Sequence, residues 1–353
     1  MKNDAFEISG QYVQPGERTT IDIPLAAMPT HSTIQMPVHI INGKRAGPAL
    51  FISAAIHGDE INGVEIIRRL LKLKQLDTLK GTVVAIPIVN VHGFITNSRY
   101  LPDGRDLNRS FPGSSKGSLS GRMADTFFKV VVEKCTHGID LHTAARHRDN
   151  LPQVRADLSN DEVKRLSMVF GVPAVIDSKI RDGSLRAVAG DNNIPVLLYE
   201  AGEALRFDEV SIRAGMRGII NVMRELGMLK SLRRKELVKN PVISSKTSWV
   251  RAPYSGILRA LVPLGAKAKK GSVLGVIGDP LGVNEFQVIA PEDGIVIGRT
   301  NLPLVYEGDA LFHLAYYKQQ VDSVFDQVES FQEKLEPNLA TKLPSDHEHS
   351  PIQ

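Results

Sequence analysis

The strongest constraint on the fold is the alternation of apolar runs with helical patterns over the first 240 residues. The runs at 48–56 and 81–90 are continuous, which is typical of strands buried on both faces of a sheet. Shorter strand patterns follow at 138–142 and 195–202, and residues 32–43 alternate. Apolar residues recur at helical spacing in the segments between them, at 63–76, 122–135, 159–171 and 208–227. This alternation predicts an α/β fold with a mostly parallel or mixed sheet flanked by helices.

The character of the sequence changes after residue 240. Short strand patterns and glycine turns replace the helical spacing, and "RAPYSGIL" (251–258) returns as "IAPEDGIV" (289–296). This repeat predicts a small pseudo-symmetric all-β domain. We therefore expect an α/β domain over 1–240, a β domain over 241–317, and a tail over 318–353 that is first helical and then disordered.

Charge and apolar patterning exclude several classes of protein. The chain has 43 Lys and Arg against 39 Asp and Glu, a net charge of +4 without a concentrated basic face, so we expect no binding of nucleic acid. No apolar run approaches the roughly 20 residues that span a bilayer, so we expect no membrane segment. The single cysteine, Cys135, allows no intrachain disulfide. We expect a cytoplasmic protein.

Three side chains form a candidate metal site. His57 and Glu60 follow the apolar run 48–56 and stand three residues apart, which would place both on one side of a helix that begins there. The third candidate is His142, at the end of the strand pattern 138–142, where Asp140 could accept a hydrogen bond from its ring. Catalytic zinc typically takes three such ligands and leaves one position for water.

Other residues near these patterns leave alternatives open. Asp59 is expected to cap the helix or to orient a ligand. His92 is the main rival ligand, although a loop histidine bonded to backbone is the favoured interpretation. Glu200 and Glu203 are both candidates for a general base. We favour Glu200 because a charged side chain at the end of an apolar strand is costly unless it is paired or faces a site.

The segment 92–122 predicts a long loop, and its part 97–113 is rich in arginine. It holds Arg99, Arg105, Asn108 and Arg109, whose side chains suit carboxylates and a developing oxyanion. A loop of this length without regular structure is often functional, although a polar surface loop is the alternative.

The order H-G-D-E, D-x-N-R, D-L-H-T and E-x-G resembles the succinylglutamate desuccinylase/aspartoacylase family, within the zinc-carboxypeptidase superfamily. The resemblance covers about residues 45–317. It implies a zinc hydrolase α/β domain with zinc held by His57, Glu60 and His142, and Glu200 as the general base that activates a zinc-bound water. It further implies that Arg99 polarises the carbonyl, and that three residues bind substrate: Asn108, Arg109 and Tyr306.

The β domain resembles a biotinyl/lipoyl-type barrel-sandwich. The position of the attachment lysine falls on Val283, so a swinging-arm role is not expected. The sequence departs from the aspartoacylases after Glu200, where "EAGEAL" replaces their Gly-Pro-Gln run. Arg146, Arg148 and Arg155 are extra and would either read an acidic end of the substrate or be solvated.

These expectations define a zinc-dependent amidohydrolase that removes the acyl group from an N-acyl amino acid or a related small amine. A zinc carboxypeptidase acting on peptides and a non-catalytic binding protein with a degenerate site are the alternatives. The expected partners are one zinc ion per chain and a small acidic N-acylated substrate, and a homo-oligomer is possible.

Overall fold

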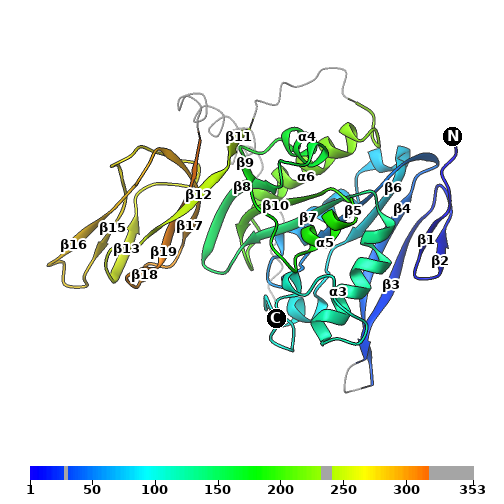
Figure 1. Cartoon of the computed structure of the whole chain (residues 1–353), viewed down its shortest axis with the longest axis horizontal. Coiled ribbons are helices and arrows are strands. Elements are labelled where there is room, and N and C mark those ends of the chain that lie inside the picture. Colours follow the sequence, from blue (N-terminus) through cyan, green and yellow to red (C-terminus); the bar gives the residue numbers. More distant parts are fainter. Residues whose placement is uncertain (28–30, 232–240, 318–353) are drawn as a thin grey trace, which may run out of the picture.

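The computed structural model describes residues 1–27, 31–231 and 241–317, and its centre is a large mixed β-sheet (Figure 1). The strands follow the order β12-β19-β17-β8-β10-β7-β5-β6-β4-β3. The four central strands are parallel: β10 (Val196–Glu203), β7 (His137–Ala144), β5 (Arg45–Ala54) and β6 (Lys80–Ile86). Antiparallel strands extend the sheet on both sides: β4 (Thr33–Asn42), β3 (Arg18–Ala27), β8 (Arg148–Ala156), β17 (Gly294–Thr300), β19 (Ala310–Tyr316) and β12 (Lys246–Arg251). The sheet is therefore mixed, with a parallel centre, as the alternation predicts.

Helices cover both faces of the α/β part (Figure 1). One apolar core lies under α1 (Asn62–Leu70), α4 (Asp161–Phe170) and α6 (Glu209–Glu225). A second core lies on the other face, under α3 (Leu119–Val130) and α5 (Leu185–Asp191). Because both faces of the central strands are buried in this way, these strands read as continuous apolar runs.

The structure also corrects parts of the prediction. The helical pattern 63–76 ends at residue 70 and is followed by the 3-10 turn η1 (Lys74–Thr78). The segment 92–122 is not free of regular structure, because α2 (Val91–Ile95), η2 (Leu107–Arg109) and the start of α3 fall in it. The sequence patterns did not predict α5, β8 or the smaller elements β1 (Phe6–Ile8), β2 (Gln11–Val13), η3 (Val132–Lys134), β9 (Ala174–Asp177) and β11 (Val242–Ser244).

The C-terminal part is all-β. A four-stranded sheet in the order β16-β15-β13-β18 faces the end of the large sheet across an apolar core that includes Leu258, Ile277 and Phe312. Its strands are β13 (Gly256–Ala260), β15 (Val273–Gly278), β16 (Glu285–Ile289) and β18 (Leu304–Val305), and β14 (Lys267–Ala268) pairs with β17. The two copies of the repeat lead into β13 and β17. Because β17 is hydrogen-bonded to β8, one sheet runs from this part into the α/β part.

The remaining sequence predictions concern the hairpin tip at Val283, the tail of the chain and membrane segments. Val283 lies at the exposed tip of the β15–β16 hairpin, where residues 279–284 contain no lysine. The expected tail, 318–353, lies outside the described residues. Within the described ranges, no helix has the length and apolar content needed to cross a membrane.

Candidate active site

The candidate site lies where three neighbouring parallel strands end. Strand β5 leads into the turn that carries His57 and Glu60, and β7 carries His142 near its end. Glu200 on β10 is in register with His142 on β7. Carboxyl ends of parallel strands lie at one edge of a sheet, so residues far apart in the sequence come together there.

His57 and Glu60 lie in a tight turn and not in a helix, which corrects the prediction. Helix α1 begins at Asn62, and the backbone N–H of Glu60 donates to the carbonyl of His57 at 3.1 Å. A Cβ atom at Gly58 would lie 2.0 Å from the carbonyl carbon of Gly93 in α2, so only glycine fits at this position. The turn brings the two side chains together as the helix was expected to do.

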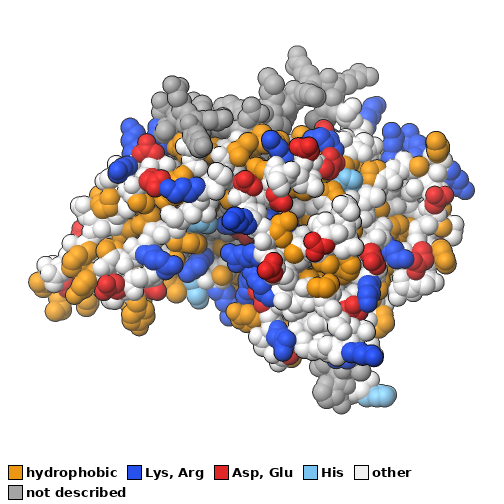
Figure 2. Space-filling model, viewed as in Figure 1, with side chains coloured by type: hydrophobic (Ala, Val, Ile, Leu, Met, Phe, Trp, Pro, Cys, Tyr) orange, Lys and Arg blue, Asp and Glu red, His pale blue; other side chains and the backbone are white. Residues whose placement is uncertain are grey.

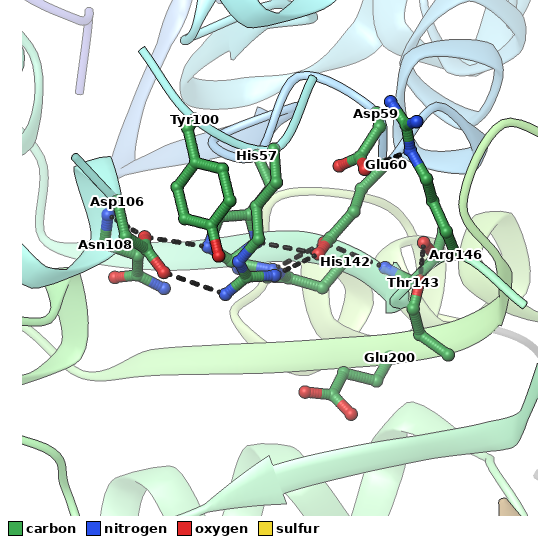
Figure 3. Close-up of polar contacts among 12 residues, drawn as sticks. His57, Asp59, Glu60, Tyr100, Asp106, Asn108, His142, Thr143, Arg146 and Glu200 are labelled. Atoms are coloured by element: carbon green, nitrogen blue, oxygen red, sulfur yellow. Dashed lines mark hydrogen bonds and ion pairs between the residues drawn. The ribbon is translucent and has the colours of Figure 1, made fainter. Parts of the chain in front are cut away.

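The three predicted ligands converge and are buried. One ligand atom from each of His57, Glu60 and His142 lies within 4.8 Å of the others. Glu60 stands between the rings, with Oε1 2.7 Å from Nδ1 of His57 and Oε2 2.8 Å from Nδ1 of His142 (Figure 3). Burial disfavours its charge, but the two imidazoles hold the pKa of Glu60 well below its usual range. Despite burial, the facing carboxylates raise the pKa of both histidines.

The outer ring nitrogens of both histidines face carboxylates. Nε2 of His142 lies 2.7 Å from Oδ2 of Asp140, whose Oδ1 accepts from Ser53 at 2.7 Å. Nε2 of His57 lies 3.1 Å from Oδ1 of Asp106. A carboxylate on Nε2 fixes the proton there and leaves Nδ1 free to bind a metal. The donor set therefore fits a divalent metal ion.

The contact of Asp140 with His142 confirms its expected place as an acceptor. Asp106 was not singled out from the sequence, although it is the aspartate of the quoted D-x-N-R motif. Asp106 also accepts from Arg99, so it connects the candidate ligand His57 to a cation.

Arg99 reaches the same group from the arginine-rich segment. Its guanidinium donates to Oε1 of Glu60 at 3.2 Å and to Oδ2 of Asp106 at 2.9 Å (Figure 3). Burial opposes its charge, but these two carboxylates raise the pKa of Arg99. A fixed cation beside the candidate metal ligands is placed to meet negative charge on a substrate.

Asn108 lies in η2 beside Asp106, and its amide is oriented by the backbone (Figure 3). Its Oδ1 accepts from the N–H of Leu185 at 2.9 Å, so its NH₂ group is the donor that remains for a ligand. Arg109 donates to the carbonyl of Asn108. Burial, with Arg181 and Arg99 nearby, lowers the pKa of Arg109.

The cationic group is larger than the sequence predicted. Arg186 on α5 donates to the carbonyl of Arg155 and to Ser178, and burial lowers its pKa, with the charge of Glu200 opposing. Arg181 and Arg186 were missed because their segment gave no helical or strand pattern. Arg105 and Arg181 are both exposed, whereas Arg186 is half-buried.

Glu200 is held by strand β8. Its Oε2 accepts from Nε of Arg155 at 2.9 Å and from Nδ2 of Asn150 at 3.1 Å. Figure 3 shows its carboxylate turned away from the three candidate ligands. Glu203, the rival candidate, instead accepts from the backbone N–H of His147 and from Asn301, so it stabilises a loop.

The extra arginines each have a defined contact. Nε of Arg146 lies 3.3 Å from Asp59, and the guanidinium of Arg148 lies 4.9 Å from the centre of the Trp249 ring. Asp59 does not cap α1, whose N-cap is Ile61. Arg146 and Arg148 also line a cleft whose other wall comes from the C-terminal β part, where Figure 2 shows basic side chains gathered.

Two candidates lie apart from the group. Tyr306 is 75% exposed in the turn after β18, and no hydrogen bond of its side chain is found within the described ranges. His92 lies in α2, and its buried Nε2 has no hydrogen-bond partner in the described part of the chain. His92 is not in the converging group, so the rival ligand assignment is not supported.

A buried His-Glu-His group at the carboxyl edge of an α/β sheet is the arrangement that metal-dependent hydrolases use. Residues 46–226 match the model of the succinylglutamate desuccinylase/aspartoacylase catalytic domain. The chain therefore belongs to this family of enzymes that hydrolyse amide bonds, as the sequence motifs predicted.

Similar proteins agree with this assignment. The chain is 27% identical over 297 residues to the N-alpha-acetyl-L-2,4-diaminobutyric acid deacetylase of Halomonas elongata, covering 80% of this chain and 86% of that protein. Its fold is similar to a succinylglutamate desuccinylase/aspartoacylase from Rhodobacter sphaeroides, with a TM-score of 0.73, 23% identity and coverage of 85% and 96%. It is also similar to the ectoine utilization protein EutE (DoeB) of Ruegeria pomeroyi, with a TM-score of 0.76, 20% identity and coverage of 90% and 100%.

Proposed function

We propose that this chain is a zinc-dependent deacylase that cleaves the amide bond of an N-acyl amino acid or a related small N-acylated amine. The observation that carries the proposal is the convergence of His57, Glu60 and His142, with each histidine fixed through Nε2 by a carboxylate. Zinc bound to these three side chains would polarise the amide carbonyl and lower the pKa of water.

The remaining groups of the site supply proton transfer and charge. Glu200 is proposed as the general base: once its side chain turns toward the three ligands, its carboxylate accepts a proton from the attacking water and returns it to the leaving nitrogen. Arg99 stabilises the negative charge that develops on the carbonyl oxygen, because its guanidinium is already fixed beside Glu60. Asn108 and Arg109 bind a carboxylate of the substrate through an amide donor and a planar cation.

The substrate class follows from charge. Arg99 and Arg181 lower the pKa of Arg109, and Arg181 lowers the pKa of Arg186, so repulsion between cations supports a positively charged side of the site near Asn108. Such a group favours an anionic substrate. The name of the Halomonas relative suggests an N-acetylated diamino acid as the first compound to test.

The test is metal-dependent deacylation. The purified chain, stripped by a chelator and then supplied with zinc, is assayed with N-acetyl-2,4-diaminobutyrate, N-acetylaspartate and N-succinylglutamate. We expect activity with at least one compound that disappears on stripping and returns with zinc. No metal-dependent activity on any of them, or on a wider panel of N-acyl amino acids, would reject the proposal.

Two variants separate binding from catalysis. Glu200→Gln is expected to bind zinc with unchanged stoichiometry and to lose roughly 100-fold or more in kcat, the usual contribution of a general base. Glu203→Gln is the matched control, because the Glu203 carboxylate accepts from the backbone N–H of His147 and from Asn301, and its kcat should change little. Release of C-terminal residues from peptides, with N-acyl amino acids untouched, would favour a carboxypeptidase instead.

Several expectations from the sequence belong to the same proposal. They are the division at residue 240, a barrel-sandwich form for the C-terminal part, a pocket role for Tyr306, a cytoplasmic location without nucleic-acid partners, and a homo-oligomer. Tyr306→Phe tests the pocket role of Tyr306 by its effect on KM, because the substitution removes only the hydroxyl of an exposed side chain.

A further inference from the structure

Strand β8 connects the catalytic centre to the C-terminal β part. On one side it pairs with β10, where Gln153 is in register with Glu200 and Asn150 with Gly202. On the other side it pairs with β17, where Asn150 is in register with Gly298. One strand, β8, therefore separates β17 from the strand that carries Glu200.

Two side chains of β8 fix one oxygen of Glu200. Asn150 and Arg155 both donate to Oε2, at 3.1 and 2.9 Å, while Oε1 has no hydrogen-bond partner within the described ranges. Two donors on the same atom set the direction of the carboxylate, which Figure 3 shows turned away from the three candidate ligands, so Glu200 reaches that side of the site only when its side chain rotates about these contacts. Asn150 is buried, and the side chain of Arg155 is 20% exposed, so neither donor moves freely.

The C-terminal part packs against these donors. A Cβ atom on Gly298 would lie 2.7 Å from Oδ1 of Asn150, closer than carbon and oxygen normally approach. Nδ2, on the same amide, is the group that holds Glu200. The preceding residue of β17, Ile297, accepts through its carbonyl from the buried side chain of Gln153 at 3.3 Å.

A stack of rings supports the same strand. His313 on β19 is buried against the Trp249 ring at 4.7 Å, with the two planes 8° apart. Burial, with Arg155 and Arg148 nearby, lowers the pKa of His313 to about 3, so it is neutral and adds no repulsion to the two arginines. The guanidinium of Arg148, at the start of β8, lies over the ring of Trp249, which is the stacking partner of His313.

We propose that the C-terminal β part positions the general base: β17 holds Asn150, and Asn150 with Arg155 holds Glu200. Asn150, Arg155 and Gly298 are positioning residues in this scheme, because they act through Glu200. The inference rests on the proposed role of Glu200, and it gives the C-terminal part a task in catalysis without contact with the substrate.

The test is Gly298→Ala, with Gly278→Ala as its matched control. Gly278 lies in β15 of the same part, and a Cβ atom there would meet nothing closer than 3.7 Å. We expect Gly298→Ala to push the amide of Asn150 away and to lower kcat about tenfold or more, since small displacements of a catalytic group are costly. KM and zinc content should stay within twofold of the parent, and Gly278→Ala should match the parent.

Two further measurements separate positioning from a general loss of structure. In a Glu200→Gln background, Gly298→Ala should lower the residual kcat no more than twofold, because the base it positions is already removed. Arg155→Lys should retain more kcat than Arg155→Gln, since lysine keeps a charged donor. If Gly298→Ala fails to fold, Asn150→Ala removes the same contact without adding atoms and is expected to show the same loss and the same epistasis.

The outcomes distinguish this inference from the proposed function. If Glu200→Gln abolishes turnover but Gly298→Ala and Asn150→Ala behave like Gly278→Ala, the positioning role is rejected and the deacylase stands. Equal losses from Gly298→Ala with and without Glu200 would also reject it. If Glu200→Gln keeps full turnover, the assigned base is wrong, and the positioning role falls with it.

Discussion

Asp140→Asn is the sharpest test of how the metal centre is built. Asp140 is fully buried in β7, with one oxygen on Nε2 of His142 and the other on Ser53. The substitution keeps the size of the side chain and removes its charge. It therefore perturbs the orientation and basicity of one ligand without touching the ligand itself.

The expected magnitude follows from these contacts. Loss of a carboxylate behind a ligating histidine costs 10- to 100-fold in metal affinity, or about 1.4–2.7 kcal/mol. Asparagine can still place its amide oxygen on Nε2 if its NH₂ group turns to Ser53, so Asp140→Asn should lie near the tenfold end. Asp140→Ala leaves Nε2 without an acceptor and should lie near the hundredfold end. Ser53→Ala keeps the contact with His142 and should change affinity only a few-fold.

The assay is competition for zinc with a chromogenic chelator of known affinity at fixed pH, with the stability of each metal-free variant measured in parallel. The predicted order of zinc affinity, from tightest to weakest, is parent, Ser53→Ala, Asp140→Asn, Asp140→Ala. Equal zinc affinities for the parent and Asp140→Ala would show that the buried carboxylate does not orient His142. The inference that a carboxylate on Nε2 prepares Nδ1 for the metal would then be wrong.

Three further predictions concern protons and packing. The pKa of His57 and of His142 is raised in the protein without metal, so zinc binding near pH 7 should release roughly one to two protons. Calorimetry in buffers of different ionisation enthalpy measures this release. A binding enthalpy that does not depend on the buffer would contradict the prediction. Burial and nearby carboxylates raise the pKa of Asp149 to about 6, so ionisation costs stability as pH rises from about 4 to above 6. Asp149→Asn should then stabilise the fold by about 3 kcal/mol at pH 8 and by much less at pH 4, and equal effects at both values in denaturant titrations would refute the assignment. Gly58→Ala should lose zinc and lower the melting temperature, because its Cβ would meet the backbone of Gly93; normal zinc content would show that the turn adapts.

The convergence of the candidate metal ligands could be predicted because their positions depend on local rules. A buried parallel strand reads as an apolar run, and its end is where side chains reach the sheet edge, so His142 and the pair His57 and Glu60 were placed together. The exact local structure mattered less than the spacing. A turn closed by Glu60 N–H on the His57 carbonyl juxtaposes the two side chains as a first helical turn would.

The cationic side of the site was only partly predictable. Arg99, Asn108 and Arg109 stood out because they fall in one segment rich in arginine. Arg181 and Arg186 come from a different segment, and only the packing of α5 under β10 and η2 brings them to the site. No periodic pattern marks α5, which has seven residues and begins at a capping serine, Ser184. Contacts of this kind are set by tertiary structure, which a single sequence does not display.

Strand β8 escaped prediction for a reason connected with its role. A strand in a sheet interior is expected to be apolar and free of proline, yet β8 contains Asn150, Pro152, Gln153 and Arg155. Pro152 is tolerated because the neighbour of β8 changes there, from β17 at residues 148–150 to β9 at residues 153–156.

The polar residues of β8 are kept for contacts rather than for the sheet itself. Asn150 and Arg155 hold Glu200, and Gln153 holds β17. Burying amide and guanidinium groups in a sheet is costly unless each finds a partner, so a strand that carries three of them reflects a requirement other than stability. The contacts of Asn150, Gln153 and Arg155 all fit one requirement, which is to orient the carboxylate of Glu200 where the α/β part meets the C-terminal β part. On this view, replacing Gln153 with leucine should raise or leave unchanged the stability of the fold, because its Oε1 is buried without a partner in the described part of the chain, while kcat falls. A loss of stability with kcat intact would mean that β8 is polar for structural reasons alone.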